Sequence, residues 1–214
     1  MTFPSTSQVR WLIKPLWFTA CLAPFVWMNL QAFEIVGSLG PDPIEETQDF
    51  MGIWALRMLL LTLALTPLRR LTGWLWLIRL RRQTGLFALF YASMHLLNYL
   101  GPDQGFLWAE IIEDIIERPF ITLGALATLG MLALGITSTH GWQRRLGRNW
   151  QKLHRAVYVI AIFAVWHFWW QVKAGFGEPA IYAAILTVLL LARLKKTSRG
   201  KKTAAPGNPD AANQ

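Results

Sequence analysis

The chain has 214 residues, of which 54% are hydrophobic, 15% are charged and 12 are tryptophan. This composition excludes an ordinary soluble domain of the same length and favours a compact bundle of membrane helices. The net charge of +9 would suit a nucleic-acid-binding protein, but the basic residues cluster between apolar segments, which argues against that class. Cys21 is the only cysteine, which excludes an internal disulfide, a cysteine zinc site and an iron–sulfur cluster held by four thiolates of this chain.

Apolar stretches long enough to cross a bilayer, at about 20 residues each, recur along the chain. We identify six, at residues 11–33, 51–68, 84–101, 120–139, 154–172 and 179–194. The first is too long for the apolar core of a signal peptide and lacks a small-residue cleavage site, so we expect it to remain as a helix. The sequence therefore predicts an all-α membrane protein with six transmembrane helices over residues 1–196. The polar tail at 197–214 is expected to be disordered.

Charged residues alternate in sign between successive connections. Acidic residues gather at 34–49 and 103–117, whereas arginine and lysine dominate the other connections and both ends of the bundle. The positive-inside rule then places both termini and the even-numbered connections in the cytoplasm. The one glycine-rich match, GFGEPA at 175–180, follows an apolar helix rather than a strand, so we interpret it as a tight outer loop in which Pro179 starts the last helix.

Two connections have amphipathic patterns. Residues 72–82, TGWLWLIRLRR, alternate tryptophan and leucine with arginine, which predicts an interfacial segment on the cytoplasmic face. Residues 109–119, AEIIEDIIERP, place paired isoleucines at helical spacing between acids. This pattern predicts a short amphipathic helix on the outer surface that ends before Pro119.

The histidines are the main candidates for function, because an imidazole inside a bilayer is costly unless it has a partner. His95 lies 13 residues beyond Arg82, and His167 lies 13 residues beyond His154. Both distances correspond to about 20 Å of helix rising from the cytoplasmic side. His95 and His167 are therefore expected at one depth on parallel helices, where two imidazoles could hold the iron of one haem inside the bundle. The alternative is a pair of histidines that only bridge neighbouring helices.

His154 fits this scheme less simply. Thirteen residues advance an ideal helix by about 220° beyond whole turns, so His154 and His167 do not share a face. Either the helix is distorted or the two histidines serve different sites. His154 is a third candidate haem ligand, or else a headgroup-level histidine beside Arg155; His140 is the other imidazole at that depth and is a weaker candidate. Arg81 and Arg82 could line a donor-side pocket there, for a quinol or a flavin.

Arg57 is the lone charge within the second apolar stretch. A guanidinium at that depth needs an anion. A haem propionate would provide this negative charge, which makes Arg57 a candidate cofactor-binding residue. Snorkelling to the outer interface or pairing with Asp49 would satisfy it equally well.

Several segments together resemble one known family. They are RRQTG (81–85), MHLLNY (94–99), RPFITLG (118–124), TST (137–139) and QRRLGRNWQKLHRAVYVIAIFAVWH (143–167), with LGPDP (39–43) on the outer side. This set resembles the haem-binding membrane subunits of the bacterial periplasmic methionine sulfoxide reductase system, the MsrQ or YedZ type, within the ferric-reductase-like transmembrane proteins. The resemblance covers nearly the whole chain.

The resemblance implies transmembrane electron transfer by b-type haem in the bacterial inner membrane, with one haem or two. Electrons would pass from the quinone pool to a periplasmic molybdopterin-containing subunit that reduces methionine sulfoxide in oxidised proteins. FMN is implied by the resemblance alone. The family histidines match His95, His154 and His167, and His140 has no counterpart. Larger oxidase relatives carry two histidines on the third helix, where this chain has one. The resemblance therefore does not provide a complete second pair of haem-ligating histidines.

The resulting prediction is an electron-transfer subunit that does not itself act on methionine sulfoxide. A ferric reductase or another quinone-linked cytochrome b subunit is the nearest alternative. The alternative from another class is a non-redox membrane anchor for a partner protein. A reduced-minus-oxidised optical spectrum distinguishes these classes, because only the cytochromes carry haem.

Overall fold

The computed structural model describes residues 4–172 and 175–199, with side chains described up to Arg193. Throughout these residues the chain forms helices and turns and no strand, which confirms the predicted all-α class. The expected disorder of the tail falls mostly at 200–214, outside the described residues. Residues 197–199 still belong to the last helix.

The helices follow one another with short connections. In chain order they are α1 (Thr6–Gln8), η1 (Val9–Ile13), α2 (Lys14–Ala32), α3 (Pro43–Thr72), η2 (Leu75–Arg79), α4 (Arg81–Asn98), η3 (Tyr99–Asp103), α5 (Trp108–Glu117), α6 (Pro119–Ile136), α7 (His140–Leu146), α8 (Arg148–His154), α9 (Val157–Gln171) and α10 (Gly177–Arg199).

Three helical segments in the described part are long and apolar enough to cross a membrane: Thr6–Ala32, Pro43–Thr72 and Pro119–Ile136. They contain the second of the six expected stretches and most of the first and fourth. The third, fifth and sixth stretches lie mainly in α4, α9 and α10. The chain is thus a helical membrane protein, and its six crossings remain a prediction.

The connections agree closely with the amphipathic patterns. The predicted outer helix is α5, which ends at Glu117 and is followed by Pro119 at the start of α6. The predicted interfacial segment is the 3₁₀ helix η2, which follows Gly73. Gly73 has φ 75°, a left-handed conformation that glycine adopts without strain and that ends α3. The last helix begins at Gly177, two residues before the expected Pro179, which lies in its first turn.

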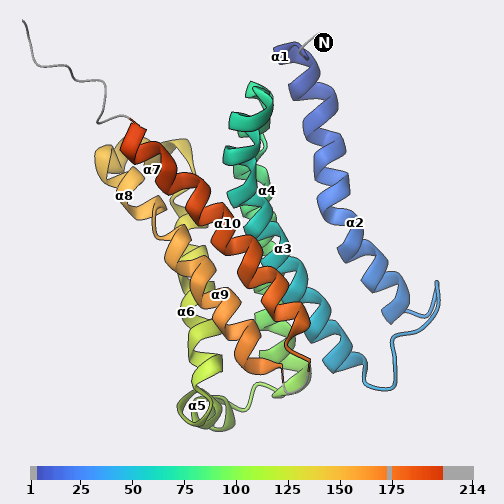
Figure 1. Cartoon of the computed structure of the whole chain (residues 1–214). Coiled ribbons are helices and arrows are strands. Elements are labelled where there is room, and N and C mark those ends of the chain that lie inside the picture. Colours follow the sequence, from blue (N-terminus) through green and yellow to red (C-terminus); the bar gives the residue numbers. More distant parts are fainter. Residues whose placement is uncertain (1–3, 173–174, 200–214) are drawn as a thin grey trace, which may run out of the picture.

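The long helices form a bundle with distinct ends (Figure 1). α3 packs along α4, α6 packs along α9, and α10 covers α9 and α3. α1, α7, α8 and the end of α10 lie at one end of the bundle, whereas α5 and the connection from α2 to α3 lie at the other. α5 runs crosswise at the foot of α6.

Tyr91 fixes α4 against α2, one turn before His95. Its hydroxyl donates to the carbonyl of Cys21 at 2.8 Å and accepts from the amide of Phe25 at 3.1 Å. These two groups lie four residues apart beside Pro24, so the hydroxyl is inserted into the backbone ladder that the proline loosens. Tyr91 is fully buried, and the arrangement holds the face of α4 that carries His95 toward the core.

Candidate functional site

His95 and His167 face each other from α4 and α9. Their ring centroids are 6.1 Å apart and their planes meet at 80°. Both side chains are partly buried. The two histidines that the sequence predicts at one depth therefore lie next to each other in the structure.

Each imidazole is oriented by a backbone carbonyl of a different helix. Nδ1 of His95 lies 2.9 Å from the carbonyl oxygen of Gln48 on α3, and Nδ1 of His167 lies 2.7 Å from that of Phe120 on α6. A carbonyl can only accept, so in both neutral rings Nδ1 carries the proton and Nε2 keeps its lone pair. This arrangement is the usual one for a metal-binding histidine, whose second nitrogen donates to a carbonyl or carboxylate.

A glycine one turn beyond each carbonyl makes room for the ring. A Cβ atom added at Gly52 would lie 3.0 Å from Cε1 of His95, and one added at Gly124 would lie 2.9 Å from Cε1 of His167. Carbon atoms ordinarily stay about 3.5–4.0 Å apart, so neither ring could keep its place beside a larger residue. The motif of a carbonyl at position i and a glycine at i+4 occurs twice, on α3 and on α6.

This histidine pair fits a haem better than a simple metal ion. The described residues contain no group of three or more His, Cys, Asp or Glu side chains that could hold a metal. A metal–imidazole bond is about 2 Å long, so two imidazoles on opposite sides of one metal have ring centres roughly 6.3 Å apart. The 6.1 Å separation agrees with that value. Two protein ligands suffice when a porphyrin fills the other positions of the metal.

Gln48 also approaches the ligand atom of His95. Its side-chain nitrogen lies 3.5 Å from Nε2 of His95, and Asn98 donates to its side-chain oxygen at 2.9 Å. Asn98 therefore orients the Gln48 amide toward the side of the ring where a metal would bind. Sequence reasoning could not identify these partners, because α3 and α4 must first be docked against each other.

His154 lies at the other end of the bundle, at the end of α8. Its Nε2 is 3.2 Å from the hydroxyl of Thr137, and its ring stacks on Trp150 with centroids 4.1 Å apart. Arg81 is close enough to act on it electrostatically. The structure brings no second histidine to it among the residues described. His140 is exposed at the start of α7.

Arg57 is partnered by a residue that the sequence did not indicate. Its Nε donates to the hydroxyl of Tyr182 on α10 at 2.8 Å, and its guanidinium lies 5.1 Å above the Trp54 ring. Its side chain is exposed. Asp49 is not its partner, because the one ion pair found within the described residues joins Arg118 to Asp114.

The two candidate donor-side arginines differ in environment. Arg82 is exposed, whereas Arg81 is partly buried at the start of α4. Burial lowers the pKa of Arg81, and the positive charge of Arg193 on α10 lowers it further. Arg193 itself donates to the hydroxyl of Tyr158 at 2.5 Å and to the carbonyl of Leu63 at 2.6 Å. Sequence reasoning grouped Arg193 with the basic end of the chain and missed this inward position.

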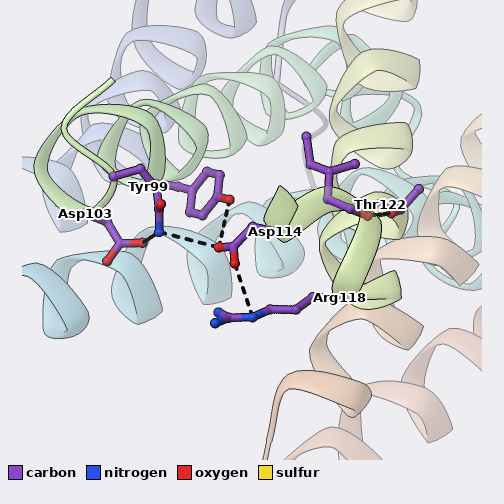
Figure 2. Close-up of polar contacts among 7 residues, drawn as sticks. Tyr99, Asp103, Asp114, Arg118 and Thr122 are labelled. Carbon is purple, nitrogen blue, oxygen red and sulfur yellow. Dashed lines mark hydrogen bonds and ion pairs between the residues drawn. The ribbon is translucent and has the colours of Figure 1, made fainter. Parts of the chain in front are cut away.

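A polar network joins α5 to η3 and to the start of α6 (Figure 2). Asp114 on α5 accepts from the Tyr99 hydroxyl at 3.2 Å and pairs with Arg118 at 3.3 Å. Thr122 on α6 donates to the carbonyl of Ile115 at 2.8 Å. These contacts tie α5 to η3 and to the first turn of α6, whose Phe120 carbonyl orients His167.

Comparison with known proteins places the chain in a family. Residues 51–165 match the family described as "Ferric reductase like transmembrane component", and that range includes His95 and His154. A protein of Xanthomonas euvesicatoria pv. vesicatoria (strain 85-10) is 48% identical over 214 residues, covering 98% of this chain and 97% of its own length. A protein of Herminiimonas arsenicoxydans is 46% identical over 217 residues, covering 98% of both chains. Each is named protein-methionine-sulfoxide reductase heme-binding subunit MsrQ. The chain belongs to the MsrQ family, within the ferric-reductase-like transmembrane proteins, as the sequence resemblance predicts.

Proposed function

We propose that this protein is a b-type cytochrome subunit that carries electrons across the bacterial inner membrane to a periplasmic methionine sulfoxide reductase. The observation that supports this most directly is the pairing of His95 and His167, each with its carbonyl and glycine on the facing helix. His95 and His167 would be the axial ligands of a haem b. That haem supplies one-electron chemistry, and the protein supplies ligand orientation, depth in the membrane and exclusion of water.

The proposed topology has six crossings with both termini in the cytoplasm. The distribution of basic and acidic connections supports it. So does the position of α1, α7, α8 and the end of α10 at one end of the bundle, opposite the acidic α5 (Figure 1). In this orientation the paired histidines lie toward the periplasmic side and His154 toward the cytoplasmic side.

The proposed electron path runs from the cytoplasmic end of the bundle to its periplasmic end. The quinone pool would be the donor, either directly or through FMN, at a pocket near His154 that is lined by the partly buried Arg81 and not by the exposed Arg82. The acceptor would be a molybdopterin-containing subunit bound at the outer connections 34–50 and 102–119, forming a heterodimer with this chain. The chain would transfer electrons only, and methionine sulfoxide would be reduced by the partner.

An optical and magnetic spectrum of the purified protein tests the proposal. A reduced-minus-oxidised difference spectrum should show a low-spin b-type cytochrome. The oxidised protein should give a low-spin electron paramagnetic resonance signal, as expected for a haem iron held by two imidazoles. Absence of haem from a monodisperse preparation would favour the non-redox anchor.

The electron acceptor of the reduced cytochrome separates the proposed route from its nearest alternative. A ferric reductase would pass electrons to chelated iron at least as fast as to the periplasmic subunit. The proposed function requires oxidation of the reduced cytochrome by that subunit in the presence of a methionine sulfoxide substrate.

A further inference from the structure

Two arginines, Arg81 and Arg193, are partly buried at the cytoplasmic end of the bundle. Arg193 reaches from α10 to the neutral acceptors Tyr158 and Leu63, and its charge also acts on Arg81 at the start of α4. The guanidinium of Arg193 lies 5.0 Å above the Tyr158 ring. Neither arginine forms an ion pair within the described residues.

The amino-acid sequence itself restricts what could neutralise these charges. Of the twelve acidic residues, all except Asp210 lie at 34–49, at 103–117 or at 178, on the outer connections. Helices α4, α6, α7, α8 and α9 contain no acidic residue. Asp210 lies outside the described residues. Partly buried guanidinium groups without a counterion are strongly unfavourable, so an anion that the described part of the chain does not supply is the natural complement.

Two buried polar atoms in this region also have no partner. Nε of Arg193 and the hydroxyl oxygen of Thr66 are both shielded from solvent, and neither forms a hydrogen bond with the described residues. Thr66 lies on α3, three residues beyond Leu63, whose carbonyl binds Arg193. Buried polar groups are nearly always hydrogen-bonded, so these two donors without an acceptor favour a ligand with several acceptor oxygens.

We infer that Arg81, Arg193 and Thr66 form a binding site for an oxyanion, a carboxylate or phosphate group on a cofactor or lipid, between the cytoplasmic ends of α3, α4 and α10. Arginine suits this role because its planar guanidinium binds either group through two parallel hydrogen bonds. Arg82 is not part of the site, because its side chain is exposed. The inference adds an anion-binding site to the donor side of the proposed function. It rests on that function only for the identity of the ligand.

The test uses the full-length protein purified in detergent, with Arg81→Gln, Arg193→Gln and the matched control Arg82→Gln. Flavin mononucleotide and riboflavin are titrated separately, because they differ only in the phosphate. Haem and lipid phosphorus per protein are measured on the same samples. Arg193→Lys keeps the positive charge but lacks the planar guanidinium group that forms two parallel hydrogen bonds. A monodisperse elution profile confirms that each variant folds. Arg81→Gln remains informative if Arg193→Gln does not fold, because the Arg81 side chain makes no hydrogen bond with the residues that the structure describes.

The expected result is that flavin mononucleotide binds more tightly than riboflavin, and that Arg81→Gln and Arg193→Gln each weaken its binding about 10- to 100-fold, the usual effect of a charged hydrogen bond. Riboflavin binding and the Arg82→Gln variant should be unaffected. Loss of haem from the same two variants instead identifies the anion as a haem carboxylate, and loss of co-purified phosphorus identifies a phospholipid. Each of these outcomes supports the site.

Equal affinity for the two flavins together with unchanged haem and phosphorus in Arg81→Gln and Arg193→Gln would overturn the inference. An equal effect of Arg82→Gln would overturn it as well, because it would indicate surface charge rather than a site. The low-spin signal of the outer histidine pair reports on the proposed function separately. Its absence from the wild-type protein would refute the cytochrome while leaving the flavin comparison valid.

Discussion

Gly124 offers a substitution whose effects on haem binding and on folding have opposite signs. In Gly124→Ala the new Cβ atom would lie 2.9 Å from Cε1 and 3.0 Å from Nδ1 of His167. An ordinary carbon contact needs about 3.5–4.0 Å, so the ring must move by at least roughly 0.6 Å. That movement disturbs the 2.7 Å contact between Nδ1 and the Phe120 carbonyl.

The expected effect of Gly124→Ala combines a loss of haem affinity with a gain in helix stability. Disturbing a group that orients a metal ligand typically lowers metal affinity about 10- to 100-fold, which is roughly 1.4–2.7 kcal/mol. Replacing glycine by alanine inside a helix stabilises that helix by about 1 kcal/mol. We therefore expect Gly124→Ala to lower haem affinity while the haem-free protein melts at the same temperature or slightly higher.

The assay is a haemin titration of the haem-free protein, followed by absorbance, with thermal melting of the same sample. Gly85→Ala on α4 is the control, because its Cβ atom would make only an ordinary contact, 3.6 Å from Cγ2 of Thr62. A Gly124→Ala protein that binds haem as tightly as the control would refute the role of the glycine.

Three further predictions address the remaining candidate residues. Replacing His95 or His167 by alanine should remove most of the bound haem while the protein still inserts; full Soret absorbance and a low-spin spectrum in both variants would contradict the ligand assignment. Arg57→Ala should lower the reduction potential of the outer haem by roughly 40 mV, the effect of about 1 kcal/mol on a one-electron couple; an unchanged potential in a redox titration would leave Arg57 with only its bond to Tyr182. His154→Ala should remove about half of the haem if a second haem lies there, or abolish reduction by quinol or reduced flavin if it lines a donor pocket. Unchanged haem content and electron uptake would exclude both roles for His154.

The sequence predicted the features that depend on position along a single helix. The rise per residue places His95 and His167 at one depth, and the paired isoleucines define α5 to within two residues. Each of these inferences uses only local periodicity, which an amino-acid sequence records directly.

The partners of the histidines could not be predicted in this way. The Gln48 carbonyl lies 47 residues before His95, and the Phe120 carbonyl lies 47 residues before His167. This equal spacing reflects two helix pairs of similar design, α3 with α4 and α6 with α9, although we find no repeat in the sequence. Backbone carbonyls carry no sequence signal, and a glycine in an apolar helix has many explanations. Only the docking of the helix pairs identifies Gly52 and Gly124 as the residues that admit the rings.

The relative orientation of His154 and His167 is explained by the turn between α8 and α9. The amides of Arg155, Ala156 and Tyr158 each bond to the carbonyl three residues earlier, which is the 3₁₀ pattern. Such residues turn about 120° each rather than 100°, so three or four of them raise the total rotation from about 220° to roughly 280–300°. The overwound turn thereby brings both imidazoles toward α6. His167 contacts the carbonyl of Phe120 in its first turn, and His154 contacts Thr137 just after its last. A regular α-helix through residues 154–158 would direct His154 away from α6, so the distortion allows one segment of chain to present a histidine to the same helix at both ends of the bundle.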